Sequence, residues 1–184
     1  MNATAPITRD ARDARIALAW EVLGTVLDPE VPALSLCDLG IVRDVLPQGD
    51  AADSLLEVVL TPTYSGCPAT ELIERNVLEA IAAAGLGPAR VRLQRAPAWT
   101  TDWISAEGSR KLREYGIAPP GPVAVGAALP LRFISRRALV SQSIACPRCA
   151  STDTAQLSAY GSTACKALYR CLACLEPFEY FKSI

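Results

Sequence analysis

The sequence predicts an α+β fold, in which a small mixed sheet is packed by helices and is followed by a small C-terminal module held by a metal ion. Three observations lead to this prediction. Helix and strand patterns alternate in the first part of the chain, a stretch without charge and rich in Pro and Gly follows, and two Cys-x-x-Cys pairs lie beyond it. We therefore expect an α/β domain over residues 1–117, a linker over 118–130 and a metal-bound ribbon over 131–184.

The first expected element is an amphipathic helix over residues 9–27. Its apolar side chains recur at helical spacing, at Ile16, Trp20, Leu23 and Leu27. The Asp28-Pro29 pair should end it, since a residue before proline is pushed out of the α region. An irregular loop over residues 28–40 follows, with carboxylates at Asp28, Glu30 and Asp38. These could line a site, or Asp28 and Asp38 could cap turns of the backbone.

The next patterns predict two strands, a helix and a third strand. Residues 41–46 and 55–61 are rich in β-branched and apolar side chains around a turn at 48–50, which favours an antiparallel hairpin. A helical pattern follows residue 68 and should end near Gly85 and Gly87 in a left-handed cap. Residues 90–96 alternate between charged and apolar side chains and indicate a strand, and residues 105–115 indicate a helix that stops at Gly116.

The segment between the second strand and its helix, Thr-Pro-Thr-Tyr-Ser-Gly-Cys-Pro at 61–68, carries the thiol of greatest interest. We expect Gly66 to turn the chain through positive φ and Pro68 to take the first helical position. The thiol of Cys67 would then face the positive end of the helix dipole, which should lower its pKa below about 8.5. This setting suits a reactive or metal-binding sulfur. The alternative is a buried Cys that fills a small hole at the turn.

Composition narrows the chemistry further. The chain has seven Cys and no His, so Ser-His and Cys-His dyads are excluded and a metal site must use Cys, carboxylate or backbone ligands. No signal-like segment or membrane-length apolar run is visible, and the Cys are paired at Cys-x-x-Cys spacing, so we expect a cytoplasmic chain with metal thiolates and no membrane partner. Residues 131–184 hold seven basic and three acidic side chains. This module could dock on the first domain, on an acidic protein or on a phosphate-bearing ligand, and a solvated basic face is favoured over a nucleic-acid surface.

The strongest motif is the pair of Cys-x-x-Cys turns formed by Cys146 with Cys149 and by Cys171 with Cys174. Each turn can direct two sulfurs at one ion, and the two turns together complete a tetrahedron. Four thiolates leave no open coordination position, so we expect a structural zinc, with iron in a rubredoxin-like site as the alternative. Short strands at 154–160, 167–170 and 178–181 would form the ribbon. The remaining thiol, Cys165, is expected to be buried and inert.

Several of these motifs resemble known families. The Asp-Pro-Glu-Val-Pro at 28–32, the Asp-Leu-Gly-Ile-Val at 38–42 and the segment at 61–68 resemble the metal-sulfur cluster biosynthetic family, whose members assist late iron-sulfur protein maturation. The Cys-Pro-Arg-Cys turn, the Gly-Ser-Thr-Ala-Cys-Lys-Ala-Leu-Tyr-Arg-Cys at 161–171 and the Pro-Phe-Glu-Tyr-Phe-Lys at 177–182 resemble one branch, PaaD, which is associated with the bacterial phenylacetyl-CoA ring epoxidase.

The resemblance implies an accessory role and no catalysis. The implied partners are the oxygenase or the reductase components of the epoxidase system. Cys67 matches the family's reactive cysteine, which would bind iron or an iron-sulfur cluster transiently or contact the client protein. Asp28, Glu30 and Asp38 match its acidic loop positions. One thiol per chain cannot hold a cluster, so a homodimer, Cys37 or a partner thiol would have to complete it.

Two departures and two competing functions accompany this resemblance. Cys37 stands where an aliphatic residue is expected, and Ala150 replaces the glycine usual after the first Cys-x-x-Cys turn. The chain could instead be a purely structural or docking subunit in which Cys67 only packs. A thiol enzyme is the third hypothesis, and without His its base would have to be a carboxylate or the helix dipole alone.

Overall fold

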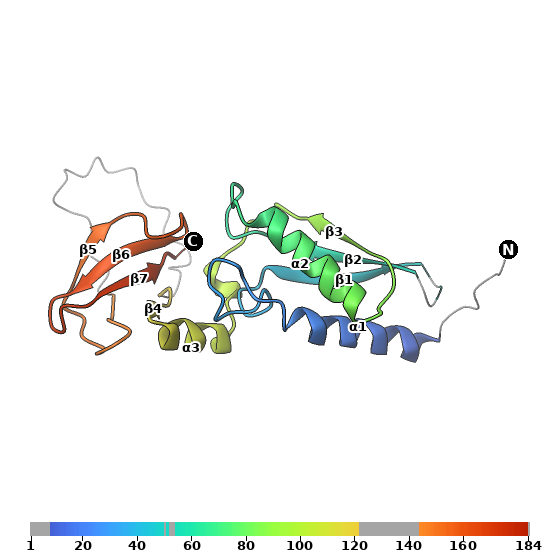
Figure 1. The fold of residues 1–184 in the computed structure, drawn as a ribbon, viewed down its shortest axis with the longest axis horizontal. Helices are drawn as coiled ribbons and strands as arrows, with labels where there is room; N and C mark the ends of the chain where they lie inside the picture. The colour runs from blue at the N-terminus through green and yellow to red at the C-terminus, as the bar shows by residue number, and fades with distance from the viewer. Residues whose placement is uncertain (1–7, 50, 52–53, 122–143, 184) are drawn as a thin grey trace. The chain divides into compact units, whose positions relative to one another are not determined.

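The structure is a computed structural model that describes residues 8–49, 51, 54–121 and 144–183, and its elements are labelled in Figure 1. The chain divides into two compact units between Lys111 and Leu112. Within the described residues, no helix combines the length and the apolar character needed to cross a membrane.

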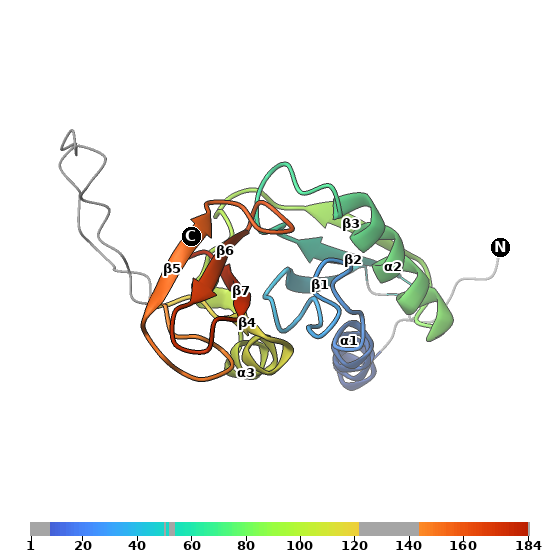
Figure 2. The same cartoon turned by 60° about the vertical axis from the view of Figure 1, so that its left-hand side comes forward.

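The first unit is built on a three-stranded mixed sheet, as the sequence predicts. Strands β1 (Val42–Gln48) and β2 (Leu55–Leu60) form the expected antiparallel hairpin. Helix α2 (Thr70–Ala83) then carries the chain to β3 (Ala89–Leu93), which pairs parallel with β2 and gives the order β1-β2-β3. Helix α1 (Arg9–Leu23) contacts both β1 and α2, and Figure 2 shows the two helices beside the sheet. The buried core is therefore sheet against helix.

The central strand carries one buried charge, and the edge strand neutralises it. The Glu57 side chain is buried in β2, where its two carboxylate oxygens accept hydrogen bonds from Nε of Arg90 and Nε of Arg92, each at 2.8 Å. The hydrogen bond from Arg92 is the largest of the effects that lower the pKa of Glu57. Both arginines alternate along β3 as the sequence pattern predicts, and their shared partner explains why a carboxylate is tolerated inside the sheet.

Helix α1 ends four residues earlier than its apolar spacing predicts. Gly24 caps the helix through its backbone N–H, and the Thr25 hydroxyl donates to the Val22 carbonyl at 2.7 Å. The chain therefore turns before Leu27, which is 49% exposed, while Val26 takes the buried position. The expectation for 9–27 was wrong at its end, because the N–H groups of Thr25 and Val26 bond to the Val22 and Leu23 carbonyls and tighten the last turn, which stops the helix despite the continuing apolar pattern.

The C-terminal end of α2 is a left-handed cap, as predicted. Gly85 has a φ of 66°, and its N–H donates to the Ala82 carbonyl at 3.0 Å. The next N–H, of Leu86, reaches back to the Ile81 carbonyl at 3.2 Å. This pair of hydrogen bonds is a Schellman motif, which satisfies carbonyls that would otherwise lack donors.

The second unit is a four-stranded sheet in the order β4-β7-β6-β5. The three expected ribbon strands are β5 (Thr154–Ser158), β6 (Lys166–Cys171) and β7 (Pro177–Phe181), joined as antiparallel neighbours. The strand β4 (Ile117–Ala118) pairs parallel with β7. A 3-10 turn η1 (Thr101–Trp103) and helix α3 (Ala106–Tyr115) precede it. Buried side chains of Phe178, Tyr180 and Ala167 form the core of this sheet.

The division between the units differs from the expected boundary at residue 117. It falls within α3, and both residues of β4 belong to the second sheet, although the sequence pattern assigned Ile117 to the first domain and Ala118 to the linker. Two residues are too few for a strand pattern, so only the pairing with β7 reveals them. Most of the expected linker at 118–130 and the start of the expected ribbon lie outside the described residues.

Candidate functional site

The first candidate site is the four-cysteine cluster of the second unit. The Sγ atoms of Cys146, Cys149, Cys171 and Cys174 all lie within 4.8 Å of one another. The Sγ atoms of Cys146 and Cys174 are 3.8 Å apart, and those of Cys149 and Cys171 are 3.5 Å apart. Zinc-sulfur bonds of about 2.3 Å give a tetrahedron with edges of about 3.8 Å. The sulfur spacing therefore fits a tetrahedral zinc held by four thiolates.

Two similar turns present these sulfurs. The first turn is closed by a hydrogen bond from the Ala150 N–H to the Cys146 carbonyl at 2.9 Å, and the second is tied by the Cys171 N–H to the Glu176 carbonyl at 3.0 Å. The residue after each turn has a left-handed backbone, with φ of 62° at Ala150 and 68° at Leu175. Neither is glycine, so both turns hold a side chain in a conformation that L-residues disfavour.

The backbone also prepares one sulfur to be a thiolate. The N–H groups of Cys174 and Ala173 point at the Cys171 sulfur and lower the pKa of Cys171 to about 6, although burial opposes this shift. The Cys174 N–H lies 3.4 Å from that sulfur. Zinc would supply structural cross-linking here, because four protein ligands leave no position for a reactant.

The second candidate site surrounds Cys67, which does not lie on the helix. Helix α2 begins at Thr70, three residues later, so Pro68 does not occupy its first turn. The Cys67 carbonyl accepts hydrogen bonds from the Thr70 N–H at 3.2 Å and from the Thr70 hydroxyl at 2.8 Å. Gly66 is not among the residues with positive φ, so the expected role of that glycine was also wrong. The two hydrogen bonds from Thr70 therefore hold Cys67 in a turn that precedes the helix, and not in the first turn of the helix.

The pKa of Cys67 moves in the direction opposite to the one predicted. Burial raises it, and the negative charges of Glu30 and Asp28 raise it further. The Ala69 N–H and the Thr70 hydroxyl lower it, but they do not prevail. The expectation considered only the helix dipole, whose effect falls off within a turn, and missed the two carboxylates that the loop brings near the sulfur.

Cys67 nevertheless lies on an open surface. Its half-buried side chain lines a pocket of about 530 Å³. The pocket also exposes Ser65, Thr70, Glu71, Glu74 and Arg95 to a visiting group. The thiol is therefore accessible and lies among oxygen donors.

The acidic loop residues shape their own backbone. Asp28 is buried, and its Oδ1 accepts hydrogen bonds from the N–H groups of Glu30 at 2.9 Å and Val31 at 2.8 Å. The Oδ2 atom of Asp38 accepts from the Ser35 N–H at 3.0 Å and from Lys111 Nζ at 2.7 Å. Both carboxylates thus cap turns, the interpretation that the sequence left open beside a direct role in a site.

The two other thiols differ from Cys67. Cys37 is half-buried, and burial together with the charge of Asp38 raises its pKa to about 11. Cys165 is buried, with the Thr163 hydroxyl oxygen 3.0 Å from its sulfur. Across the described part of the chain, the ribbon cysteines are the one group of three or more Cys, Asp or Glu side chains that converge as metal ligands. Cys67 would therefore need further ligands from elsewhere.

Sequence patterns did not identify the lysines that pair with the carboxylates of Glu179 and Asp38. Lys166, only 2% exposed, lies with its Nζ 3.1 Å from Oε2 of Glu179 across β6 and β7. Burial alone would raise the pKa of Glu179, but the Ser162 N–H and the Lys166 ammonium lower it. The position of Lys166 within the otherwise apolar pattern of β6 could have indicated a buried ion pair. Lys111 lies on α3 among other charged residues, so its sequence neighbours gave no indication that it pairs with Asp38.

Two family models match the chain, one in the part that contains Cys67 and the other in the part that contains the four-cysteine cluster. The model described as "Iron-sulfur cluster assembly protein" matches residues 17–92, and the one described as "PaaD zinc beta ribbon domain" matches residues 134–182. The first range contains Cys67 and its acidic loop. The second contains all four converging cysteines, so the second unit is a zinc ribbon with a four-cysteine cluster.

Proteins similar in sequence and a solved structure similar in fold agree with these family matches. The chain is 47% identical over 165 residues to the Escherichia coli K12 protein named as the D subunit of a "Putative 1,2-phenylacetyl-CoA epoxidase", covering 90% of this chain and 91% of that protein. It is 32% identical over 92 residues to the "Fe-S protein maturation auxiliary factor" of Porphyromonas gingivalis, covering 50% of this chain and 84% of that one. A crystal structure of a DUF59 domain from Bacillus anthracis shares the fold, with a TM-score of 0.50, 22% identity, and coverage of 54% of this chain and 92% of that domain.

Proposed function

Because the chain belongs to the PaaD family, that of the D subunit of phenylacetyl-CoA epoxidase, we propose that it is an accessory subunit in phenylacetate degradation. In this proposal it assists the maturation of iron-sulfur or iron centres in the epoxidase system, with Cys67 as the transient ligand. Its partners are then the oxygenase or reductase components of that system. It carries no step of the oxygenation itself.

The observation that supports this proposal is the contrast between the two groups of thiols. Four sulfurs converge at tetrahedral spacing, whereas Cys67 lines an open pocket, with no such group formed around it in the described residues. A permanently held zinc would thus give shape to the second unit, and the sulfur of Cys67, outside that cluster, remains available for exchange. The match to an iron-sulfur assembly family covers residues 17–92, a range that includes Cys67, and this supports its assignment as the exchanging thiol.

The raised pKa of Cys67 suits a metal ligand more than a nucleophile. Burial and the charges of Glu30 and Asp28 keep its proton on at neutral pH, which weakens attack on carbon or sulfur. An arriving ferrous ion displaces that proton as the thiolate-iron bond forms, and the proton leaves to solvent. The same carboxylates attract a cation, so a site that disfavours a bare thiolate favours an iron-bound one.

One sulfur holds cargo only briefly, which is what transfer requires. The remaining ligands would come from the client protein or from a second copy of the chain. Cys37 is the other candidate, although its own raised pKa means that it too must lose a proton on binding.

The test is co-expression of the chain with the reductase component, followed by iron and acid-labile sulfide analysis of the purified reductase. Cys67→Ala should lower cluster occupancy severalfold, because the transient ligand is lost. Arg75→Ala, which alters an exposed side chain of α2 outside the pocket, is the control and should leave occupancy unchanged. Equal occupancy with Cys67→Ala and wild type would contradict the proposal.

A purely structural or docking subunit is the second candidate, and the partial burial of Cys67 is the observation that favours it. Here the thiol only packs, and the zinc ribbon alone holds the epoxidase components together. Substitution of Cys67 would then be silent, while Cys146→Ser or Cys171→Ser would abolish co-purification with those components.

A further inference from the structure

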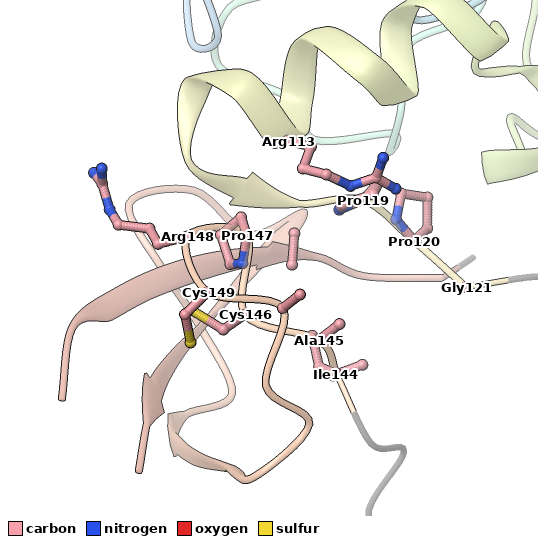
Figure 3. Close-up of a pocket in the computed structure, with 12 residues that line it drawn as sticks. Arg113, Pro119, Pro120, Gly121, Ile144, Ala145, Cys146, Pro147, Arg148 and Cys149 are labelled. Atoms are coloured by element: carbon pink, nitrogen blue, oxygen red, sulfur yellow. The ribbon is translucent and has the colours of Figure 1, made fainter. Parts of the chain in front are cut away.

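A pocket of about 560 Å³ lies beside the first Cys-x-x-Cys turn of the second unit, and no step proposed above uses it. Figure 3 shows its lining: the turn around Pro147 on one side, and the segment that follows α3 and β4, with Pro119 and Pro120, on the other. The side chain of Ile144 contributes a further apolar wall. The volume lies within the range of about 300–1,000 Å³ that binding pockets have.

Two arginines give this pocket its charge. Arg113 comes from the last turn of α3, and its side chain reaches Pro119 and Pro120. Arg148 belongs to the Cys-x-x-Cys turn, and Figure 3 shows its side chain at the opposite rim of the pocket, directed away from the two prolines. Both are exposed. Within the part of the chain that the structure describes, neither guanidinium has an ion-pair or hydrogen-bond partner, in contrast with Arg90 and Arg92, which share Glu57.

The chain itself offers little to neutralise these arginines. Residues 122–143 connect the two edges of the pocket in sequence, and they contain three arginines but no Asp or Glu. The lining of the pocket itself includes no Asp or Glu, and Glu179 of the ribbon is already paired with Lys166. Charge complementarity therefore favours an occupant from another molecule, one that carries carboxylates.

We infer that this pocket is the docking site for an acidic segment of a partner protein, a chain segment with two carboxylates and an apolar residue between them. Guanidinium groups bind carboxylates through two parallel hydrogen bonds, and the proline-rich floor accommodates the apolar residue. This inference rests on the proposed function for its partner, an oxygenase or reductase component. It assigns recognition of that partner to Arg113 and Arg148.

The site depends on the metal centre, because ligands Cys146 and Cys149 form part of its wall. Loss of zinc would release the turn and with it Arg148. Removal of zinc should therefore also abolish docking of the acidic segment, although the carboxylates of that segment do not serve as zinc ligands in this proposal.

The experiment measures binding of the full zinc-loaded chain to each purified epoxidase component, at 50 mM and 300 mM salt. Arg113→Glu and Arg148→Glu should each weaken binding at least about tenfold at low salt, and the wild type should lose affinity at high salt. Arg170→Glu makes the same charge change at an exposed position on the same ribbon, outside the pocket, and should weaken binding less than about twofold. One zinc per chain in every variant verifies the fold, and Arg148→Gln should give an intermediate loss.

The outcomes separate this inference from the proposed function. Wild-type affinity in both Arg→Glu variants, or an equal loss with Arg170→Glu, overturns the inference and leaves the Cys67 result intact. Selective loss in the two variants supports it, even if Cys67→Ala leaves cluster occupancy unchanged and the maturation role fails. Displacement of the component by coenzyme A would assign the pocket to a small anion. Self-association that Arg113→Glu abolishes would assign it to a second copy, and either result overturns the inference.

Discussion

Replacement of Ala150 by Gly should strengthen zinc binding, because Ala150 is held at a φ of 62° immediately after the first Cys-x-x-Cys turn. A left-handed backbone costs an L-residue about 1–2 kcal/mol, a cost that glycine avoids. Glycine also makes the unfolded chain more flexible, which destabilises the folded state by about 0.4–1 kcal/mol. The net gain should be about 0.5–1 kcal/mol. Folding and metal binding are coupled in so small a module, so zinc affinity should rise about two- to fivefold.

The assay is competition for zinc between the full chain and a chromophoric chelator. Ala145→Gly serves as the control, since Ala145 is exposed, adjoins the same turn and has no positive φ. Leu175→Gly tests the same reasoning at the second turn, where φ is 68° and the side chain is 59% exposed, so little burial is lost. Unchanged or weaker zinc binding in Ala150→Gly, or an equal gain in Ala145→Gly, would refute the reasoning.

Three further predictions concern the metal, the acidic loop and the thiol. Cys171→Ser should remove zinc from the chain and unfold the ribbon, as seen by metal analysis and loss of dispersed ribbon signals in NMR. Asp38→Ala should destabilise the first unit by about 2–3 kcal/mol in urea unfolding, because the Ser35 N–H and the Lys111 ammonium lose a charged acceptor. Glu30→Gln should accelerate alkylation of Cys67 at pH 8, measured by mass spectrometry, since removal of a nearby negative charge lowers the pKa of that thiol.

Each of these predictions has a result that would contradict it. Full zinc content in Cys171→Ser would remove that cysteine from the ligand set, and a wild-type alkylation rate in Glu30→Gln would deny the influence of its charge. All three tryptophans precede residue 104, so their fluorescence reports unfolding of the first unit, which contains Asp38. A wild-type urea midpoint in Asp38→Ala would mean that its hydrogen bonds contribute nothing.

The Asp38 contribution also has a defined pH dependence. Burial would raise the pKa of this carboxyl, but hydrogen bonds from Lys111 and Ser35 lower it. A group whose pKa is lowered by folding stabilises the folded state above its unfolded pKa of about 3.9. That stability should disappear as the pH falls through the lowered pKa of the folded chain. In Asp38→Ala the same acid limb of the stability curve should be flatter.

The features that the sequence predicted well depend on nearby residues. The hairpin of β1 and β2 follows from alternation around a short turn, and the cap of α2 follows from Gly85. The ribbon sulfurs could be grouped by their spacing alone, because each Cys-x-x-Cys turn fixes two ligands locally. A single ion can then join the two turns over any intervening length.

The features that it missed depend on residues far apart in the chain. The pKa of Cys67 is raised partly by Glu30 and Asp28, which the loop after α1 brings close although more than thirty residues separate them in sequence. The pairing of β4 with β7 joins residues about sixty apart, and neither strand's pattern encodes the other. The expected role of Gly66 failed because hydrogen bonds around Thr70 fix the turn without a left-handed residue.

The central claim is that four thiols hold a permanent zinc while Cys67 exchanges iron. Metal analysis of the anaerobically purified chain, with and without the co-expressed reductase, tests it most directly. The account predicts one zinc per chain in both wild type and Cys67→Ala, and iron associated with the chain only in the wild type. Iron retained by Cys67→Ala, or loss of zinc on replacement of Cys67 alone, would contradict it.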